Sequence, residues 1–173
     1  MQIIAVVGSK KSGKTTTTEN LIRELAKRGY KVAAIKHIPE LDFTIDTPGK
    51  DTWRYAQAGA KTVISMAANE VATIEKVTTN SVSLEKLLKK CLGNDIVFIE
   101  GLKNIVTSKK KIPKIAVVKS KTEATNALET FKPILAFSGP YSTENLKFQV
   151  PYANGIKNPQ KLADIIEKAI LKK

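Results

Sequence analysis

Short runs of consecutive hydrophobic residues alternate along the chain with segments in which hydrophobic residues recur every three or four positions. Continuous apolar runs are typical of strands that are buried on both faces of a parallel sheet, and the wider spacing indicates helices with one buried face. The runs predict strands at residues 2–7, 31–35, 95–100, 115–118 and 134–137. The alternation of the two patterns therefore predicts an α/β fold, with a mostly parallel central sheet flanked by helices.

The helical spacing predicts helices over residues 14–28, 51–58, 81–92 and 158–171. Gly29 is placed to end the first of them. Asn158 is the expected N-cap of the last, with Pro159 in its first turn. In 81–92 the apolar positions form a single stripe that ends at Leu92. We expect the apolar stripes of these helices to pack on the sheet.

The remaining segments predict loops and one hairpin. Residues 38–50 are rich in proline and glycine and predict a long irregular loop. The β-rich pieces 62–66 and 71–74 predict a hairpin. Residues 103–114 contain three consecutive lysines and few apolar residues, so we expect an exposed, mobile loop there. No internal repeat is visible, and we expect one domain that covers residues 1–173.

The loop between the first predicted strand and the first predicted helix carries the most specific motif. Residues 8–15 match G-x-x-x-x-G-K-[ST], the pattern of a phosphate-binding loop. Its glycines permit backbone conformations that a side chain would obstruct, so that the loop amides can surround a β-phosphate at the positive end of the helix. The predicted cradle consists of Gly8, Ser9, Lys10, Lys11, Ser12, Gly13, Lys14, Thr15 and Thr16.

Three side chains of this loop have distinct expected roles. Lys14 is placed to reach the β- and γ-phosphates, Thr15 to bind Mg²⁺ through its hydroxyl, and Thr16 to contact the α-phosphate. The motif therefore predicts a nucleoside triphosphate site in a P-loop NTPase-like, three-layer fold.

A carboxylate at the end of a neighbouring strand usually completes such a metal site. The predicted strand 95–100 is an apolar run that ends in Glu100 and is followed by Gly101. We expect Glu100 to help hold Mg²⁺ and to orient the attacking water, which makes it, with Lys14, a candidate catalytic residue. Asp95 begins the same strand, about 16 Å away by strand rise, and is expected to be remote from the phosphates. The alternative is that Glu100 is an ordinary strand-end carboxylate facing solvent.

Charge and composition narrow the classes of partner and site. The chain has 29 Lys and Arg against 16 Asp and Glu, a net charge of +13, which favours anionic partners or simply lysine-rich, solubilising helix faces. The single cysteine, Cys91, and the single histidine, His37, exclude a disulfide framework and a Cys- or His-rich metal site. No apolar run is long enough to span a membrane and no signal-peptide features are visible, so we expect a cytoplasmic protein without a membrane partner.

Several further motifs occur in order after the phosphate loop. Lys36-His37 ends the second predicted strand, and Asp46–Arg54 then reads Asp-Thr-Pro-Gly-Lys-Asp-Thr-Trp-Arg, leading to Ala58-Gly59-Ala60. Ile99–Lys103 reads Ile-Glu-Gly-Leu-Lys, and a closing helix begins Asn-Pro-Gln-Lys-Leu. This set resembles the molybdopterin-guanine dinucleotide biosynthesis protein B (MobB) family over roughly residues 1–170. The Pro-Gly-Lys-Asp-Thr and Glu-Gly-Leu-Lys pieces are not general features of P-loop proteins.

The resemblance implies a GTP-binding protein with weak, Mg²⁺-dependent GTPase activity and a mainly accessory role. Such a protein acts as an adapter to the guanylyltransferase that joins GMP to molybdopterin, is typically a homodimer, and has molybdopterin as a further candidate partner. The implied Mg²⁺ ligands are Thr15, Glu100 and Asp46. The chain departs from the family after His37 and after Arg54, where members often carry additional histidines that are absent here.

Some of these residues keep more than one interpretation. Lys36 and Lys50 would place positive charge near a triphosphate or near a second phosphorylated ligand. Asp46 and Asp51 would coordinate metal or cap the helix at 51–58, and for Asp51 we favour capping. His37 is predicted to be a packed or hydrogen-bonded residue at a strand end rather than a ligand.

Base preference and reaction type are weakly encoded. No Asn-Lys-x-Asp box is present, and 119–123 is either a degenerate version, with Glu123 accepting from guanine, or a lysine-rich turn in which Glu123 starts a helix. Preference for GTP over ATP thus depends on the resemblance.

The main alternative is a small-molecule or nucleotide kinase, which generally needs an arginine-rich lid, whereas the chain has three arginines. A nucleic-acid-binding ATPase would suit the charge and the lysines at 109–111, but the aromatic stacking residues of single-strand binders are lacking.

Overall fold

The computed structural model describes residues 1–40, 42–78 and 81–171, which group into two compact units. Unit 1 consists of Met1–His37 and Leu88–Lys173, and unit 2 consists of Ile38–Leu87. The expectation of a single domain stays a prediction. Among the helices of the described residues, none combines the length and the apolar character that are needed to cross a bilayer.

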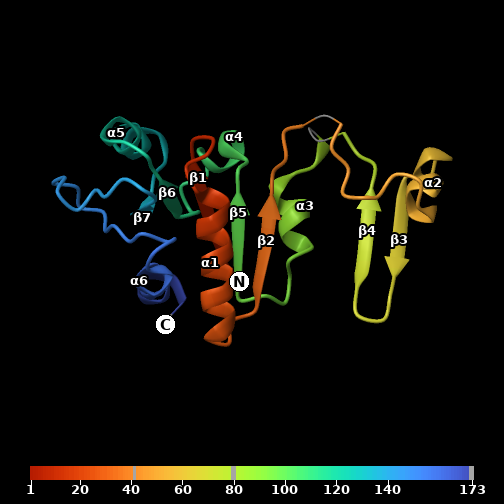
Figure 1. Cartoon of the computed structure of the whole chain (residues 1–173), viewed down its shortest axis with the longest axis horizontal. Helices are drawn as coiled ribbons and strands as arrows, with labels where there is room; N and C mark the ends of the chain where they lie inside the picture. The colour runs from red at the N-terminus through yellow and green to blue at the C-terminus, as the bar shows by residue number, and fades with distance from the viewer. Residues whose placement is uncertain (41, 79–80, 172–173) are drawn as a thin grey trace. The chain divides into compact units, whose positions relative to one another are not determined.

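Unit 1 is built on a five-stranded sheet in which all neighbouring strands are parallel (Figure 1). The strands lie in the order β2-β5-β1-β6-β7 and comprise β1 (Gln2–Gly8), β2 (Val32–Lys36), β5 (Ile96–Glu100), β6 (Lys114–Val117) and β7 (Ile134–Ser138). The predicted parallel sheet and α/β class are confirmed. In this order the second strand pairs with β5 and not with β1, so the carboxyl ends of β1, β5 and β2 meet at one edge of the sheet.

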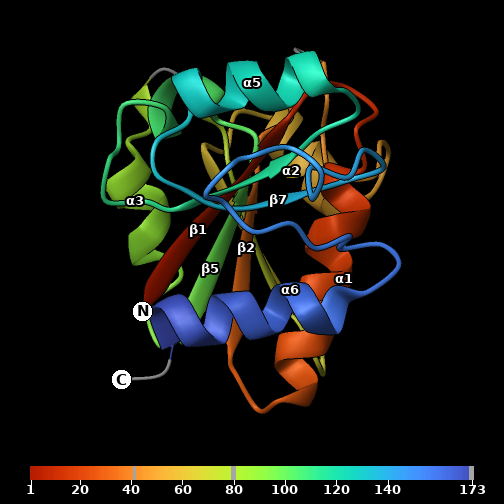
Figure 2. The ribbon, with the colours of Figure 1, turned by 90° about the vertical axis from the view of Figure 1, so that its left-hand side faces the viewer.

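One face of this sheet is covered by α1 (Lys14–Lys27) and α6 (Pro159–Ile166), which lie beside each other (Figure 2). Leu21 and Leu25 of α1 and Leu162 of α6 are fully buried against alternate strand residues such as Ile4 and Phe98. The strand residues that point to the opposite face, among them Ala5, Val97 and Ile99, are also fully buried. Burial on both faces explains why these strands are continuous apolar runs.

The segment 103–114 differs from the exposed loop that its lysines predict. It contains a short helix, α4 (Lys103–Val106), and Val106 and Ile112 are buried. Lys114 is completely buried at the start of β6, where its Nζ donates to the carbonyl oxygens of Lys109 and Lys132, both at 2.8 Å. Burial lowers the pKa of Lys114. A few anchoring side chains therefore hold a segment whose average composition is that of a loop.

One predicted helix is shorter than its apolar stripe indicates, and another covers its predicted range but changes its geometry partway. Instead of 81–92, α3 covers Leu84–Lys89, and Leu92 is exposed because the chain turns at Gly93, which has a positive φ. The last helix is interrupted, because α6 passes into a π-helical turn over Glu167–Leu171. Its start agrees with the prediction, since Asn158 caps it through a hydrogen bond from the N–H of Lys161 at 3.1 Å.

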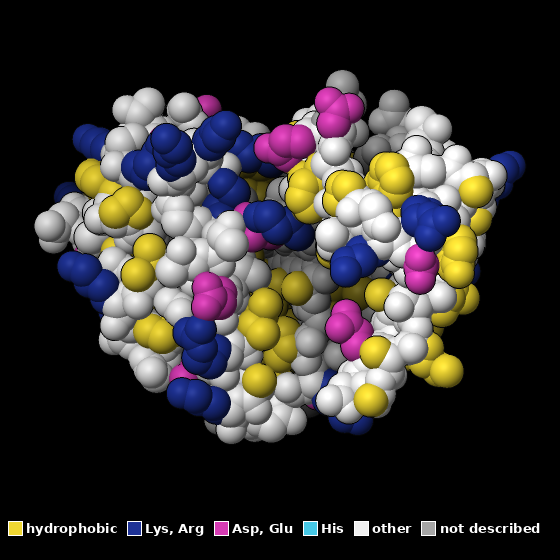
Figure 3. Space-filling view, turned by 45° about the vertical axis from the view of Figure 1, so that its right-hand side comes forward, with side chains coloured by type: hydrophobic (Ala, Val, Ile, Leu, Met, Phe, Trp, Pro, Cys, Tyr) yellow, Lys and Arg dark blue, Asp and Glu magenta, His cyan; other side chains and the backbone are white. Residues whose placement is uncertain are grey.

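Unit 2 consists of one helix and a two-stranded antiparallel sheet. Helix α2 (Asp51–Gln57) precedes β3 (Thr62–Met66) and β4 (Val71–Glu75), which form the predicted hairpin. Helix α2 packs on β3, whose Val63 is buried, while Ile64, Met66 and Val71 are 65–83% exposed. Because Met66 pairs with Val71 and Ile64 lies two residues from Met66, these three share one face of the hairpin. Hydrophobic side chains are visible at the surface of this unit (Figure 3).

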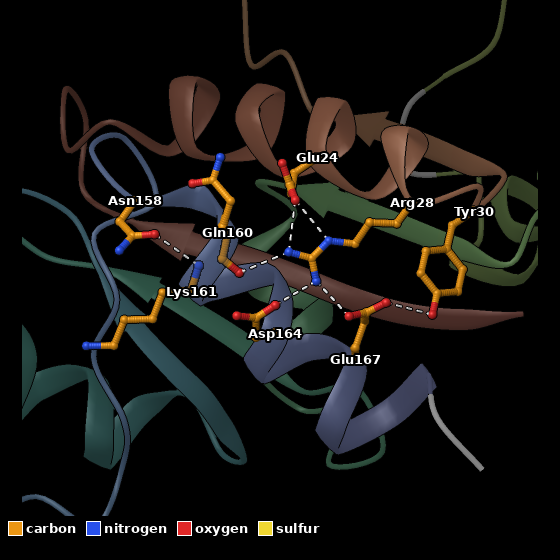
Figure 4. A network of polar contacts seen from close by, with 8 residues as sticks. All are labelled: Glu24, Arg28, Tyr30, Asn158, Gln160, Lys161, Asp164 and Glu167. Atoms are coloured by element: carbon orange, nitrogen blue, oxygen red, sulfur yellow. Dashed lines mark hydrogen bonds and ion pairs between the residues drawn. The ribbon is translucent and has the colours of Figure 1, made fainter.

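An arginine at the end of α1 joins this helix to α6 (Figure 4). The guanidinium of Arg28 contacts the carboxylates of Glu24, Asp164 and Glu167 at 2.6–2.8 Å, and the hydroxyl of Tyr30 donates to Glu167 at 2.9 Å. The Arg28 side chain is 21% exposed. The planar guanidinium satisfies several acceptors at once, which a lysine could not do.

We predict that Arg28→Ala lowers the free energy of unfolding by about 2 kcal/mol, because partly buried carboxylates on two helices lose a charge-assisted partner. Arg28→Lys keeps the positive charge but loses the planar guanidinium. Its free energy of unfolding should therefore lie between those of the wild type and of Arg28→Ala. The matched control is Arg23→Ala, which removes an exposed pair with Glu19 and should change stability by less than about 0.5 kcal/mol. Equilibrium denaturation measures all three, and equal losses for Arg28→Ala and Arg23→Ala would contradict the prediction.

Candidate functional site

The predicted phosphate-binding loop lies between the carboxyl end of β1 and the start of α1. A Cβ atom built at Gly8 would lie 2.3 Å from the carbonyl oxygen of Val117, so this position admits glycine alone without movement of the backbone. Gly13 has a φ of 95° and Lys11 a φ of 59°. Such left-handed residues turn successive N–H groups of a loop toward a common centre, which is the geometry of an anion-binding nest.

The backbone N–H groups of this loop are largely available to a ligand. Within residues 9–13, the N–H of Ser12 donates to the backbone carbonyl of Ser9 at 3.4 Å, and no other such bond is found there among the described residues. The side chain of Lys14 also folds back onto the loop, with its Nζ donating to the Ser9 carbonyl at 2.6 Å. Burial lowers the pKa of Lys14, and neighbouring lysines lower it further against the opposing charge of Glu100.

The loop meets the end of β5 through a direct contact between side chains. The Thr15 hydroxyl donates to Oε1 of Glu100 at 2.8 Å. The ammonium of Lys36, at the end of β2, donates to the same Glu100 oxygen at 2.5 Å and to the Thr15 hydroxyl at 3.2 Å. Three residues from three separate motifs of the sequence therefore form one cluster, and Lys36 bonds to both of the predicted metal ligands in unit 1.

Glu100 lies in the sheet rather than in solvent. It is 7% exposed and pairs across the sheet with Val6 on one side and Lys36 on the other. The N–H of His37 donates to its carbonyl oxygen at 2.9 Å. A side chain at Gly101 would lie 3.0 Å from the Cβ of His37, which explains the glycine. His37 is thus hydrogen-bonded through its backbone at a strand end, and whether its side chain is a ligand stays a prediction.

Two further lysines surround the loop, and sequence reasoning gave them no role at the site. Lys119 follows β6, and its Nζ donates to the carbonyl oxygen of Lys10 at 3.1 Å. Lys103, the first residue of α4, and Lys119 lie close enough to Lys14 for their charges to lower its pKa. Lys103 belongs to the Ile-Glu-Gly-Leu-Lys motif, and this motif was the sequence signal that could have indicated its place near the loop. Together with Lys14 and Lys36, they make the surroundings of the loop strongly positive.

Glu123 lies at the start of a helix, which agrees with the second interpretation of residues 119–123, a lysine-rich turn followed by a helix. The Ser120 side chain caps α5 (Lys121–Thr130) by accepting from the Glu123 N–H, and the Glu123 carboxylate accepts from the Lys119 N–H at 2.8 Å. This pair resembles a capping box, with the carboxylate accepting from the residue that precedes the N-cap. Burial would raise the pKa of Glu123, but the Lys119 N–H, the Ser9 hydroxyl and two lysine charges outweigh it and hold the pKa below its ordinary value.

The two aspartates of the middle motif belong to unit 2. Oδ1 of Asp46 accepts hydrogen bonds from the Thr47 N–H and the Thr52 hydroxyl, both at 2.9 Å, while Oδ2 is buried without a partner among the described residues. Asp51 is the first residue of α2, where its charge suits the helix N-terminus, and the structure gives it no capping hydrogen bond. A place for Asp46 beside Thr15 and Glu100 stays a prediction.

The donor atoms of Thr15 and Glu100 fit a magnesium ion. Two cis ligands of an octahedral Mg²⁺, each about 2.1 Å from the ion, lie about 3 Å apart, close to the observed 2.8 Å. Both donors are oxygens, which Mg²⁺ prefers. No group of three or more His, Cys, Asp or Glu suited to a metal occurs in the described part of the chain, so nucleotide phosphates and water would have to supply the other ligands, as is usual for Mg²⁺.

A parallel sheet with a glycine-rich loop running from its central strand into a helix defines the class of P-loop NTPase-like α/β proteins. Comparison with family models matches residues 3–138 to MobB, described as molybdopterin guanine dinucleotide synthesis protein B. The chain belongs to the MobB family. The resemblance inferred from its short motifs is therefore confirmed.

Individual relatives agree with this assignment. The chain is 38% identical over 123 residues to a putative molybdopterin-guanine dinucleotide biosynthesis adapter protein of Methanocaldococcus jannaschii, a match that covers 70% of this chain and 49% of that protein. It is 35% identical over 145 residues to the corresponding adapter protein of Haemophilus influenzae, covering 82% of this chain and 76% of that one. The chain thus spans about half the length of the archaeal relative.

Solved structures show the same fold. A crystal structure of molybdopterin-guanine biosynthesis protein B has a TM-score of 0.74 at 23% identity, covering 98% of this chain and 99% of the other. The crystal structure of Bacillus subtilis MobB also has a TM-score of 0.74, at 25% identity, covering 97% of each chain. The P-loop NTPase-like fold predicted from the sequence is confirmed.

Proposed function

We propose that this protein binds GTP with Mg²⁺ at the loop of residues 8–16 and hydrolyses it slowly, as an adapter in molybdopterin-guanine dinucleotide biosynthesis. The observation that carries the proposal is the contact between Thr15 and Glu100, 2.8 Å apart at the mouth of the phosphate loop. It joins a loop suited to phosphates to an oxygen pair suited to Mg²⁺. The adapter role is supported by family membership and by the names of the relatives in M. jannaschii and H. influenzae.

Each part of the site has a stated task in this proposal. The loop amides and the Lys14 ammonium bind the β- and γ-phosphates, and Thr16 lies in the first turn of α1 where it would meet the α-phosphate. Thr15 and Glu100 would hold Mg²⁺, which, when bound, neutralises charge that develops on the phosphates. The Glu100 carboxylate also accepts a hydrogen bond from the attacking water and so orients it. Lys36 contributes positive charge beside the γ-phosphate.

Slow turnover follows from the placement of the arginines. Fast P-loop hydrolysis uses an arginine that stabilises the transition state. Arg23 and Arg28 pair with carboxylates along α1 and α6, and Arg54 pairs with Asp51 in unit 2. Each lysine around the loop supplies a compact point charge. It lacks the planar set of donors with which a guanidinium binds two oxygens at once. An accessory role suits such a site better than rapid turnover.

Three finer parts of the proposal depend on family membership. We propose a preference for guanine over adenine, since the relatives are named for the biosynthesis of molybdopterin-guanine dinucleotide. We propose the molybdopterin guanylyltransferase as the protein partner and molybdopterin as a further ligand.

We also propose a homodimer that forms through the hairpin of unit 2. Helix α2 packs on this hairpin, and its exposed apolar residues Ile64, Met66 and Val71 share one face. A two-stranded sheet is marginal alone, and a second copy would cover this face symmetrically.

We predict that Lys14→Ala weakens binding of GTP by about a hundredfold or more, because charge-assisted hydrogen bonds to the phosphates, worth roughly 3 kcal/mol, are lost. Titration of a fluorescent GTP analogue, with unlabelled GTP and ATP as competitors, measures affinity and base preference together. The matched control is Lys27→Ala at the other end of α1, which removes the same charge and should bind normally. A loss of less than tenfold relative to the wild type in Lys14→Ala would contradict the site assignment, and equal competition by ATP would contradict the preference for guanine.

We predict that Glu100→Gln lowers the Mg²⁺-dependent hydrolysis rate by about a hundredfold, while the affinity for GTP falls less than tenfold. The amide keeps the shape of the side chain and an oxygen for the Thr15 hydroxyl, but it loses the charge that attracts Mg²⁺ and orients water. Single-turnover phosphate release measures the rate. Asp95→Asn, at the other end of β5, is the control and should hydrolyse normally. An unchanged rate in Glu100→Gln would transfer the metal role to another carboxylate, such as Asp46.

We predict that Ile64→Lys converts the dimer into a monomer, because charged ammonium groups would be buried at the face between the two copies. Light scattering behind size-exclusion chromatography measures the mass, which should fall from twice that of the chain to that of one chain. Leu92→Lys, at an exposed hydrophobic residue outside the hairpin, is the control and should remain dimeric. A monomeric wild-type protein at high micromolar concentration would rule out the dimer.

A further inference from the structure

The ammonium of Lys36 lies where the two predicted metal ligands converge. Its Nζ is 2.5 Å from Oε1 of Glu100 and 3.2 Å from the Thr15 hydroxyl oxygen, and these two oxygens are themselves 2.8 Å apart. The three atoms form a compact triangle. A Mg²⁺ ion that coordinates both oxygens would compete with this ammonium, because both cations would be held by the same pair of oxygens.

The contact of Lys36 is specific among the positive charges of the site. Lys14, Lys36, Lys103 and Lys119 lie close together, since the last three each lower the pKa of Lys14. Lys14 donates to the Ser9 carbonyl and Lys119 to the Lys10 carbonyl, both within the loop. Among the described residues, Lys36 is the lysine that forms hydrogen bonds to Thr15 and to Glu100.

The environment of Glu100 explains why an ammonium is held there. Its side chain is 9% exposed, and a buried carboxylate needs a partner of opposite charge. The Lys36 side chain is 49% exposed, so its long, flexible chain can move into solvent without disturbing the core. The carboxylate is therefore fixed in the sheet, whereas the cation beside it can be exchanged.

We propose that Lys36 is a displaceable stand-in for the metal: its ammonium keeps Thr15 and Glu100 at coordination spacing and must leave before Mg²⁺ can bind to them. This inference rests on the proposed Mg²⁺ site and adds a positioning residue that controls access to it. Metal and ammonium compete for the same oxygens, so Mg²⁺ binds weakly to the protein without nucleotide. A bound triphosphate supplies other anionic oxygens, on which the displaced ammonium can settle.

Lys36 thereby couples the binding of metal to the binding of nucleotide. Nucleotide promotes the release of Glu100 by Lys36, and Mg²⁺ promotes the contact of Lys36 with phosphate. Because coupling between two ligands is reciprocal, each increases the affinity of the other by the same factor. Removal of the ammonium should therefore increase the affinity for the metal alone and reduce this factor.

The test is binding of Mn²⁺, a paramagnetic substitute for Mg²⁺, followed through the electron paramagnetic resonance signal of the free ion. Titrations compare the wild type with Lys36→Met, which keeps the length of the side chain and removes its charge, with and without a non-hydrolysable GTP analogue. Without nucleotide, Lys36→Met should bind Mn²⁺ about tenfold more tightly than the wild type, within the range usual for coupled sites. The analogue should enhance Mn²⁺ binding by the wild type more than by the variant.

Lys103→Met is the matched control, since it removes one positive charge near Lys14 but has no hydrogen bond to Thr15 or Glu100 among those of the described residues. It should change Mn²⁺ affinity less than threefold. Equal gains in Mn²⁺ affinity for Lys103→Met and Lys36→Met would mean that the removal of any nearby positive charge causes the effect, and this would overturn the proposal. So would unchanged, weaker or undetectable Mn²⁺ binding by Lys36→Met up to millimolar concentration.

The comparison without nucleotide keeps this inference separate from the proposed function. If the wild type fails to bind GTP, the proposed function is wrong, yet the relative Mn²⁺ affinities of the three proteins still decide the role of Lys36. Thermal unfolding checks that each variant is folded, and Lys36→Gln serves as a second variant should Lys36→Met be unstable.

Discussion

The site depends on the parallel pairing of β5 between β1 and β2. This register sets Glu100 opposite both Val6 and Lys36 and puts the end of β5 directly beside the loop that leaves β1. Residues that are far apart in the sequence, such as Thr15 and Glu100, thereby come within hydrogen-bond distance. The positions are fixed by backbone hydrogen bonds of a sheet whose strands β1, β5 and β6 are buried on both faces, so the cluster is held by the core of unit 1.

The same constraint explains which glycines the loop and the strand ends need. Gly8 lies against the carbonyl oxygen of Val117 on β6, and Gly101 lies against His37 beyond the end of β2. Both glycines occur where the chain leaves a strand next to another strand end, and a Cβ atom at Gly8 would force the backbones apart. The Glu-Gly pair of the sequence thus has a structural cause: the carboxylate stays in the sheet while the next residue passes close to a neighbour.

Much of this arrangement could be predicted from the sequence, because two kinds of signal were strong. The apolar runs are direct signs of buried parallel strands, and the loop motif together with an apolar strand ending in Glu100 indicates phosphate and metal chemistry. The contact of Lys36 with Glu100 could not be predicted, because it depends on the strand order: β2 lies next to β5 because β5, which comes later in the chain, pairs between β1 and β2. The sequence contains no local signal for that order.

The errors have physical causes as well. The lysines of 103–114 suggested an exposed loop because average composition hides single anchors, and Val106, Ile112 and the buried Lys114 hold that segment in place. The apolar stripe of 81–92 suggested a longer helix than α3, because periodicity does not show that the chain turns at Gly93 and exposes Leu92. Lys103 and Lys119 were assigned no role at the site since a lysine in a lysine-rich chain carries little information by itself.

The lysines around the loop also show how a strongly positive site keeps its shape. Like charges this close repel one another, and this repulsion adds to the larger effect of burial in lowering the pKa of Lys14. Three of the four ammonium groups are offset by an oxygen of the site itself, that of Ser9 for Lys14, of Lys10 for Lys119, and of Glu100 for Lys36. Two of these acceptors are carbonyls of the loop, so the lysines brace the conformation that a polyphosphate would use. A phosphate would exchange these bonds for stronger charge-assisted ones, and the loop would have little to rearrange.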